Sequence, residues 1–165
     1  MSVRVAPATV DDVPTILRFI RGLAAYEHLE HECVATEDLL RTTLFGARPA
    51  AEVLIGSLDD APVGFALFFP TYSTFLARPG IWLEDLFVEP EHRGRGVGTA
   101  LLAHLAALAV ERESGRLEWS VLDWNEPSIG FYRALGAVPM DEWTTQRLTG
   151  DALHARGDPE LQPAL

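Results

Sequence analysis

Leu83-Glu84-Asp85-Leu86-Phe87-Val88-Glu89-Pro90-Glu91-His92-Arg93-Gly94-Arg95-Gly96-Val97-Gly98-Thr99-Ala100-Leu101-Leu102 is the stretch around which the rest of the chain is interpreted. It begins with an apolar run typical of a strand, continues with a glycine-rich turn that holds two arginines, and ends in the first turns of a helix. The helix is predicted because apolar residues recur at helical spacing, namely Val97, Leu101, Leu102, Leu105, Leu108 and Ala109. We therefore expect a strand, then an anion-binding loop, then a helix.

Three glycines, Gly94, Gly96 and Gly98, lie at or just before the first turn of this helix. The first amide N–H groups of a helix have no partner within it, and the helix dipole places partial positive charge at the same end. Glycine has no Cβ, so a ligand can approach the backbone closely. The turn is therefore suited to a phosphate or a pyrophosphate.

The spacing of these glycines differs from two familiar phosphate loops. They follow G-x-G-x-G, whereas the dinucleotide-binding fingerprint has its third glycine one place later, where Thr99 stands. The Lys-Ser/Thr ending of a P-loop is missing as well. Alone, the glycines would equally fit a flexible turn that enters a core helix. The interleaved Arg93 and Arg95, and the two acids in the preceding strand, favour a ligand site.

Two motifs resemble the GCN5-related N-acetyltransferase (GNAT) superfamily. Arg93-Gly94-Arg95-Gly96-Val97-Gly98 is similar to the R/Q-x-x-G-x-G/A loop, which in that superfamily wraps the pyrophosphate of acetyl-coenzyme A. Trp124-Asn125-Glu126-Pro127-Ser128-Ile129-Gly130-Phe131-Tyr132-Arg133-Ala134-Leu135-Gly136-Ala137 resembles the W-N-x-x-[SA]-x-x-[FL]-Y-x-x-x-G-A segment of the spermidine/spermine (diamine, thialysine) acetyltransferases. The second motif is the more specific one. The resemblance covers nearly the whole chain and implies an N-acetyltransferase that uses acetyl-CoA.

The order of the predicted elements fits a single α/β domain. We expect strands over residues 3–6, 51–58, 62–69, 81–88, 117–122 and 143–148, and a loop over 70–79. We expect one helix from residue 9 to about 26–29, a second over 36–46, a third that opens at Val97 and carries its apolar stripe to Ala109, and a fourth over 126–135. This order fits a mixed sheet with helices on both faces, and the resemblance implies the mostly antiparallel sheet of the GNAT fold. We assign residues 1–150 to one acetyltransferase domain and 151–165 to a partly frayed C-terminal tail.

The composition limits the partners. The chain has 165 residues, of which 48% are hydrophobic and 22% charged, as in ordinary globular proteins. Its net charge of −11 would repel the phosphates of nucleic acid and attract a polyamine. No apolar segment is long enough to span a bilayer, so we expect no membrane partner. Cys33 is the only cysteine and no apolar leader opens the chain, so we expect a cytoplasmic protein.

Two adjacent acids, Glu84 and Asp85, stand in a strand that is apolar on both faces. Strict alternation would place on one face Trp82, Glu84, Leu86 and Val88, and on the other Ile81, Leu83, Asp85 and Phe87. Because burying an unpartnered carboxylate is costly, at least one of the two acids should line a cavity.

Acetyl transfer to an alkylamine requires a base and an acid. An amine with a pKa near 10.4 must first lose a proton, which costs roughly 4.6 kcal/mol at pH 7. The L-E-D of the family strand implies Glu84 as the base, with Asp85 sharing or orienting it, although both acids could instead make structural hydrogen bonds. The motif implies Tyr132 as the acid that protonates the thiolate of coenzyme A. Helical spacing alone would make Tyr132 an ordinary core tyrosine.

The resemblance implies further contacts to acetyl-CoA. The loop with Arg93, Gly94, Arg95, Gly96, Val97, Gly98 and Thr99 would hold the pyrophosphate, and backbone groups of Leu86, Phe87 and Val88 would face the pantetheine arm. Asn125, Ser128 and Tyr132 would complete the cofactor site. Asn125 also fits the N-cap of its helix.

On the acceptor side the resemblance implies a groove bordered by Tyr26, Glu27, Glu84, Asp85, Trp124 and Trp143. Glu27 would hold the far ammonium of a diamine. The neighbouring segment Tyr26-Glu27-His28-Leu29-Glu30-His31-Glu32-Cys33 is rich in possible metal ligands, but no distant ligand pair accompanies it. We therefore expect a solvated acidic connection and no metal.

One departure from the polyamine enzymes concerns the acceptor. Those enzymes carry an acid after Thr-Tyr in the loop before the strand, whereas here Ser73 follows Thr71 and Tyr72. The missing acid favours a short diamine, thialysine or a lysine-like amino acid over spermidine or spermine. A peptide N-terminus, an antibiotic, or a non-catalytic acyl-CoA sensor are alternatives, although the presence of Tyr132 and Glu84 favours an enzyme. The resembling enzymes are homodimers, so we expect a homodimer.

Overall fold

A computed structural model of the chain describes residues 1–157. In chain order its elements are β1 (Val3–Pro7), η1 (Val10–Asp12), α1 (Val13–Tyr26), η2 (Glu30–Glu32), α2 (Glu37–Phe45), β2 (Glu52–Leu58), β3 (Ala61–Ser73), β4 (Arg78–Val88), η3 (Pro90–His92), α3 (Val97–Glu111), β5 (Leu117–Trp119), α4 (Glu126–Ala134) and α5 (Gly150–Gly157). These elements divide into two compact units, 1–120 and 121–165, which are described separately.

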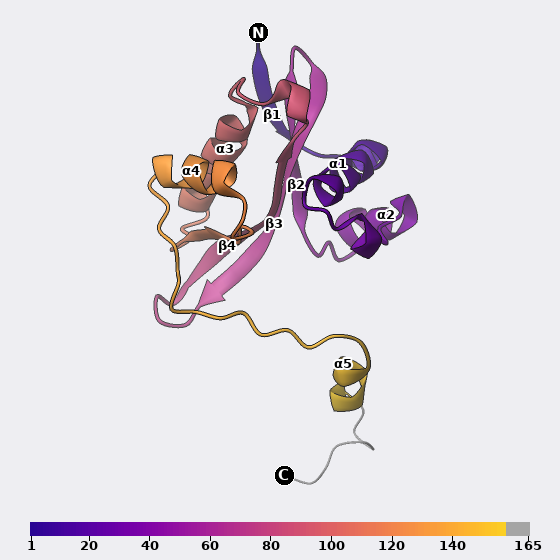
Figure 1. Cartoon of the computed structure of the whole chain (residues 1–165), viewed down its shortest axis with the longest axis vertical. Coiled ribbons are helices and arrows are strands. Elements are labelled where there is room, and N and C mark those ends of the chain that lie inside the picture. Colours follow the sequence, from indigo (N-terminus) through magenta and orange to yellow (C-terminus); the bar gives the residue numbers. More distant parts are fainter. Residues whose placement is uncertain (158–165) are drawn as a thin grey trace. The chain divides into compact units, whose positions relative to one another are not determined.

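The first unit is built on a five-stranded sheet with the order β1-β2-β3-β4-β5. The pairs from β1 to β4 are antiparallel, and β4 pairs with β5 in parallel. Figure 1 shows α3 on one side of this sheet and α1 with α2 on the other. The predicted fold class, a mixed and mostly antiparallel sheet with helices on both faces, is therefore confirmed.

Helix α1 is held against the sheet by aromatic packing. Phe19, on its buried stripe, stacks on Phe65 of β3 with 5.7 Å between ring centroids, and both are fully buried. Each such side chain stabilises the fold by roughly 1.5–3 kcal/mol. Gly22 lets α1 approach the sheet closely, because a Cβ there would lie 2.8 Å from the Phe87 ring of β4. The end of α1 is thus fixed over β4.

Helix α3 packs on the opposite face. Gly56 of β2 allows this contact, since a Cβ at Gly56 would lie 2.7 Å from Val97 Cγ1 of α3. Val97, Leu101 and Leu105 are buried there, as the helical spacing predicts. In residues 1–157, no helix combines the length and the apolar character needed to cross a membrane.

The loop predicted over residues 70–79 is wrong in extent. Strand β3 continues to Ser73 and β4 begins at Arg78, so most of the expected loop is a hairpin. The pairing of β2 with β3 ends at Phe68, so at Pro70 strand β3 has a neighbour on one side only. Pro70 lacks an N–H, and such a residue is tolerated at the edge of a sheet. The Ser73 hydroxyl accepts a hydrogen bond from the Leu76 amide (3.2 Å) and closes the turn.

The strand predicted over residues 143–148 is also wrong. Those residues have no regular secondary structure, and the described part of the second unit contains the helices α4 and α5 but no strand. Alternation of side chains cannot make a strand without a neighbour to complete its hydrogen bonds. Likewise the strand expected over 117–122 ends at Trp119. Of the tail expected over residues 151–165, the part up to Gly157 belongs to α5. The part from residue 158 on lies outside the described residues.

Candidate functional site

The glycine-rich loop has the backbone conformation that its sequence suggests. Gly94 and Gly96 have φ angles of 72° and 85°, in the left-handed region that L side chains avoid. Within residues 1–157, no atom other than those of the adjacent residues lies within 4 Å of a Cβ built at either. Ala100 donates to the Gly96 carbonyl (2.9 Å) as the first hydrogen bond of α3. The amides of the preceding first turn, Val97 to Thr99, have no acceptor within the helix. The loop is thus open in front of a helix N-terminus.

Strand β4 contains a bulge at Glu84. Leu83 pairs with Phe68 and Asp85 pairs with Leu67, so Glu84 has no partner in β3. Phe68 and Leu67 are neighbours on β3 and face opposite sides of the sheet, so Leu83 and Asp85 do too. The predicted grouping of these two residues on one face is therefore wrong. A bulge is not visible in an alternation pattern because it changes the pairing and leaves the composition unchanged.

The bulge gives the two adjacent acids different surroundings. Glu84 is exposed, and its Oε2 accepts a hydrogen bond from the Trp82 indole Nε1 (2.8 Å). Asp85 is partly buried on the face that carries Phe87 and packs against α1. Asp85 is thus the acid that is withdrawn from solvent, and the expectation that one of the two acids lines a cavity stays a prediction. The indole contact to Glu84 had no signal in the sequence beyond the two-residue spacing.

Burial is the main cause that raises the pKa of Asp85 from 3.8 to about 6, and the negative charges of Glu84 and Glu27 raise it further. Burial also raises the pKa of Glu27, at the C-terminal end of α1. The structure therefore brings together three of the predicted acceptor-side acids. Such a group of mutually repelling carboxylates favours a bound cation.

The raised pKa of Asp85 predicts the effect of Asp85→Asn on stability. A carboxyl whose folded-state pKa exceeds its unfolded value contributes stability below the unfolded pKa, and loses that contribution as the pH rises through about 6. Asp85→Asn should therefore raise the free energy of unfolding at pH 8, by on the order of 2–3 kcal/mol, and give little difference at pH 4. Denaturant unfolding at both pH values measures this.

Glu84→Gln is the matched control for that measurement. It removes the adjacent negative charge from an exposed position, so it should change stability far less at pH 8. A destabilised Asp85→Asn protein at pH 8, or equal gains from the two substitutions, would contradict the assigned environments.

Beyond the bulge, β4 has an open edge. Strand β5 pairs only with Ile81–Leu83, so in the described structure β4 has no strand neighbour on that edge from Glu84 to Val88. The resemblance implies that the backbone of Leu86, Phe87 and Val88 faces the pantetheine arm. An unpaired edge leaves backbone donors and acceptors available for such a ligand.

The second unit holds the other predicted residues on and around α4. The Oδ1 atom of Asn125, which is buried, accepts from the Ser128 amide (3.4 Å) and caps the helix as predicted. Tyr132 is partly buried one turn further on, with its ring 5.4 Å from that of Phe131. Gly136, at φ 88°, follows the end of α4 in the predicted helix-ending conformation. This unit thus groups Asn125, Ser128 and Tyr132.

Trp124 and Trp143, the two tryptophans predicted at the acceptor side, also belong to the second unit. Trp124 is 52% exposed and Trp143 is 76% exposed. Because burial is what marks a core tryptophan, neither has the surroundings expected of one. A binding role for both stays a prediction.

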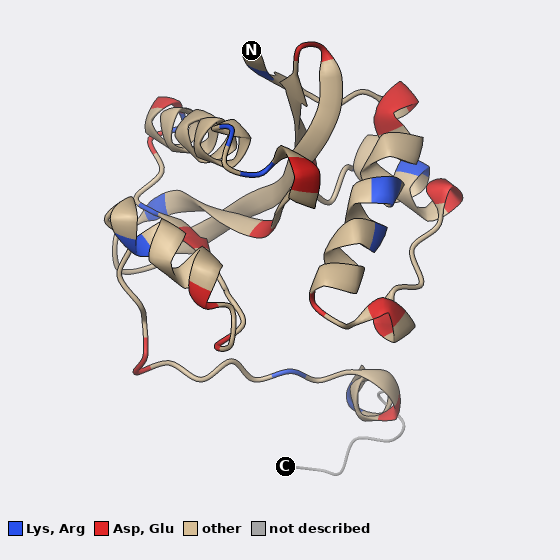
Figure 2. Ribbon diagram, turned by 45° about the horizontal axis from the view of Figure 1, so that its top comes forward, with Lys and Arg blue, Asp and Glu red and all other residues tan. Residues whose placement is uncertain are grey.

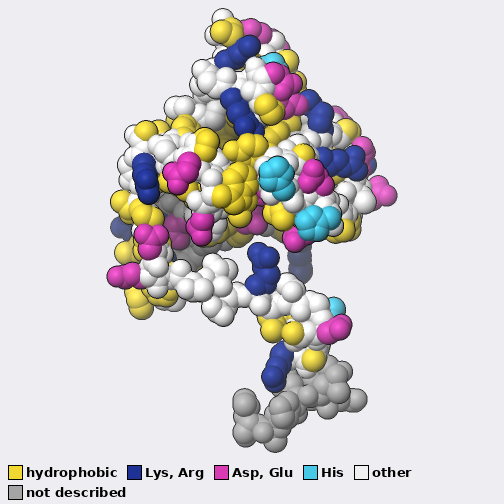
Figure 3. Space-filling model, viewed as in Figure 1, with side chains coloured by type: hydrophobic (Ala, Val, Ile, Leu, Met, Phe, Trp, Pro, Cys, Tyr) yellow, Lys and Arg dark blue, Asp and Glu magenta, His cyan; other side chains and the backbone are white. Residues whose placement is uncertain are grey.

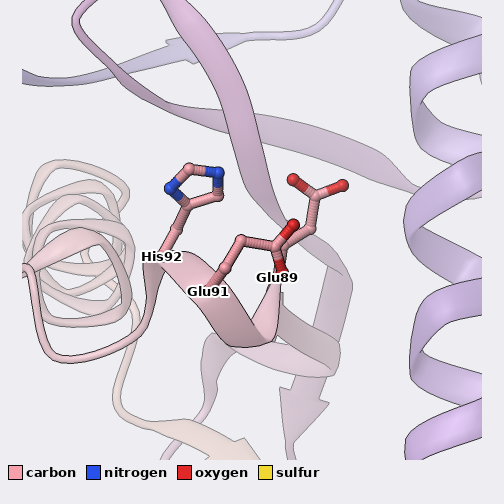
Figure 4. A group of neighbouring side chains, drawn as sticks. All are labelled: Glu89, Glu91 and His92. Carbon is pink, nitrogen blue, oxygen red and sulfur yellow. The ribbon is translucent and has the colours of Figure 1, made fainter.

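A group of three potential metal ligands lies elsewhere than the sequence suggested. It consists of Glu89, Glu91 and His92, whose ligand atoms lie within 4.8 Å of one another at η3 (Figure 4). Arg18 of α1 already forms an ion pair with Glu89. In the ligand-rich segment after α1, the Nε2 atom of His31 lies 3.8 Å from Oε1 of the adjacent Glu32. The Arg18 contact explains Glu89 as a structural acid, so we assign no metal to this group.

Two acidic residues are followed by two basic ones where the chain enters α3. The acids of η3 are followed at once by the arginines of the loop (Figure 2). Arg95 is exposed, and no partner within residues 1–157 meets its side chain. Arg93 instead lies over the Tyr26 ring of α1, with 4.5 Å from guanidinium carbon to ring centroid. The loop motif predicts the same role for both arginines and contains no signal for this difference.

Comparisons with known proteins identify the family of the chain. The sequence profile of the Acetyltransferase (GNAT) family matches residues 21–137. L-ornithine N5-acetyltransferase NATA1 of Arabidopsis thaliana is 36% identical, with 92% of this chain and 86% of that protein covered. Thialysine N-epsilon-acetyltransferase of Bos taurus is also 36% identical, with 92% and 95% covered. An integron cassette protein from V. cholerae has a similar structure, with a TM-score of 0.80, 25% identity, and 95% and 98% covered.

Proposed function

Because the chain belongs to the acetyltransferase (GNAT) family, we propose that it transfers the acetyl group of acetyl-CoA to a primary amine of a small cationic acceptor. The amine attacks the thioester directly in a ternary complex. One observation carries this proposal: the strand with the acids leads, within one short turn, into a glycine loop that is open before the N-terminus of α3. The acids that would bind the cationic acceptor and the loop that would bind the phosphates of the donor are thus close together in the chain.

The donor would be held by the loop and by β4. Amides from Gly94 to Thr99 bind the pyrophosphate, with Arg95 supplying charge, and the open edge of β4 at Leu86, Phe87 and Val88 binds the pantetheine arm. The Arg93 amide donates to the Pro90 carbonyl instead. The resemblance assigns Asn125, Ser128 and Tyr132 to the coenzyme as well. Although the net charge of −11 repels an anion, contacts at the loop act within the screening length of about 8–10 Å and dominate there. No metal is required by these contacts.

The acids would bind and deprotonate the acceptor. The exposed carboxylate of Glu84, oriented by Trp82, takes the ammonium proton directly or through water. The raised pKa of Asp85, about 6, lies close to neutral pH, so this residue shares the proton transfer. Glu27, whose pKa is also raised, holds a second positive charge of the acceptor. The resemblance assigns Tyr26, Trp124 and Trp143 to acceptor binding.

The acceptor we favour is a short diamine or an amino acid with an amine side chain. Two named relatives act on ornithine and thialysine, which both carry such an amine. Ser73 stands where the polyamine enzymes carry an acid, and here its hydroxyl closes the β3–β4 turn. This position therefore offers no charge to the extra ammonium of spermidine or spermine.

A thiol-release assay with acetyl-CoA tests the proposal. We expect release with ornithine, thialysine, lysine or a short diamine at higher kcat/KM than with spermidine, spermine, an aminoglycoside or a peptide N-terminus. Higher kcat/KM for an aminoglycoside or a peptide would contradict the acceptor class. Binding of acetyl-CoA with no release to any amine would instead favour an acyl-CoA sensor.

We propose a cytoplasmic homodimer without nucleic-acid or membrane partners. The homodimer is supported by the resemblance alone, and light scattering that shows a monomer would contradict it. Side chains of both charges are interspersed on the face drawn in Figure 3, where a nucleic-acid site would need a continuous basic surface. A single cysteine, Cys33, suits a reducing compartment.

A further inference from the structure

Arg93 joins two parts of the first unit that would bind different substrates. Its guanidinium carbon lies 4.5 Å from the centroid of Tyr26, at the end of α1, and 5.8 Å from that of Phe87 in β4. Its Nε–H donates to the Val88 carbonyl (2.9 Å), at the end of β4. The next residue, Gly94, opens the glycine loop. One side chain therefore contacts α1, β4 and the loop that it precedes.

These contacts fix the direction of the guanidinium. The guanidinium donates from Nε to the Val88 carbonyl, and one of its faces lies on the Tyr26 ring. Its position is therefore set by protein contacts before any ligand binds. Arg95, two residues on, has no such contacts within the described chain and is exposed. The two loop arginines therefore differ in what they can do for a phosphate.

The partner ring belongs to the acceptor side. Tyr26 is the last residue of α1, and Glu27 follows it as the C-cap. Glu27 contributes to the raised pKa of Asp85 across the same face of the sheet. Any movement of the end of α1 that accompanies binding of a cation by these acids would thus reach the glycine loop through the contact between Tyr26 and Arg93.

We propose that Arg93 is a positioning residue that couples acceptor binding to coenzyme binding, and that Arg95 is the loop arginine that contacts phosphate. This inference rests on the proposed function and deepens it. Arg93 holds the loop in its binding conformation through Tyr26 and the Val88 carbonyl, so removing the Tyr26 ring weakens coenzyme binding although Tyr26 lies on the acceptor side. The loss of binding free energy caused by removing the Tyr26 ring should therefore disappear when Arg93 is absent.

A double-mutant cycle on coenzyme A affinity tests this, with isothermal titration calorimetry as the measurement. Tyr26→Leu should weaken coenzyme A binding about fivefold, the size expected for one cation–π contact. In the Arg93→Ala background the same change should have almost no effect. Tyr26→Phe keeps the ring and should keep the affinity. Arg95→Ala and Tyr26→Leu should combine additively, because Arg95 does not contact that ring.

Several outcomes would overturn the coupling. Additive effects of Arg93→Ala and Tyr26→Leu, or unchanged affinity in Tyr26→Leu, would show that Arg93 does not act through the ring. If Arg93→Ala does not fold, Arg93→Lys serves in its place, because lysine keeps the charge but loses the Nε–H bond to Val88. Failure of the unchanged protein to bind coenzyme A would instead overturn the proposed function. A kinetic readout separates positioning from simple destabilisation: Arg93→Ala should raise the KM of both acetyl-CoA and the amine, whereas Arg95→Ala should raise that of acetyl-CoA alone.

Discussion

Tyr132→Phe should lower kcat for acetyl transfer at least about tenfold and leave the affinity for coenzyme A nearly unchanged. The leaving thiolate of coenzyme A needs a proton or a hydrogen bond as its charge develops, and the phenol hydroxyl is the group proposed to supply it. Phenylalanine keeps the ring, which lies 5.4 Å from the Phe131 ring, so the packing of α4 should be retained. Only the hydroxyl is lost.

Steady-state kinetics and calorimetry together test this prediction. Tyr72→Phe is the matched control, because Tyr72 is 64% exposed near the β3–β4 turn and has no proposed role. It removes the same hydroxyl and should leave kcat as it is. Full activity in Tyr132→Phe would remove the acid role from this residue. A large loss of coenzyme A affinity would make Tyr132 a binding residue instead.

Gly96→Val should weaken coenzyme A binding about a hundredfold, which is close to 3 kcal/mol. Gly96 has φ 85°, a conformation that costs a β-branched residue on the order of 1–2 kcal/mol. The added side chain would also project into the space that is open around Gly96, in front of the amides of α3. Strain and obstruction therefore act on the same contact, while the core of the first unit is untouched.

Gly150→Val provides the control for backbone strain. Gly150 has φ 57° and, like Gly96, nothing within 4 Å of its Cβ position, but it begins α5 and lies outside the loop. Gly150→Val should lower the free energy of unfolding by a similar amount and leave the affinity for coenzyme A unchanged. Equal affinities in the unchanged protein and in Gly96→Val would contradict the assignment of the loop as the pyrophosphate site.

Local patterns predicted much of the first unit, and helix α4 of the second, because they reflect local physics. The helical stripe and the glycines between Gly94 and Leu105 were enough to predict a loop and a buried helix, and Asn125 and Gly136 correctly marked the two ends of α4. A cap or a left-handed glycine acts within a few residues of itself. The sequence therefore carries the signal in full.

Pairing between strands was less predictable, because it depends on distant partners. Because of the bulge, Glu84 is exposed and Asp85 is partly buried, although the two residues are adjacent and chemically alike. The extended pattern at Trp143 gave a strand prediction that failed, since no ladder partner is present among the described residues of its unit. The contact between Arg93 and Tyr26 joins residues 67 positions apart and has no signature in either neighbourhood.

The roles assigned within the site depend on one physical claim, that the loop before α3 binds the pyrophosphate of coenzyme A. Calorimetric titration of coenzyme A into the purified protein measures it most directly. The account predicts saturable binding at one molecule per chain, weakened by Gly96→Val and unaffected by Gly150→Val. No heat of binding to the unchanged protein, at any concentration up to the millimolar range, would contradict it.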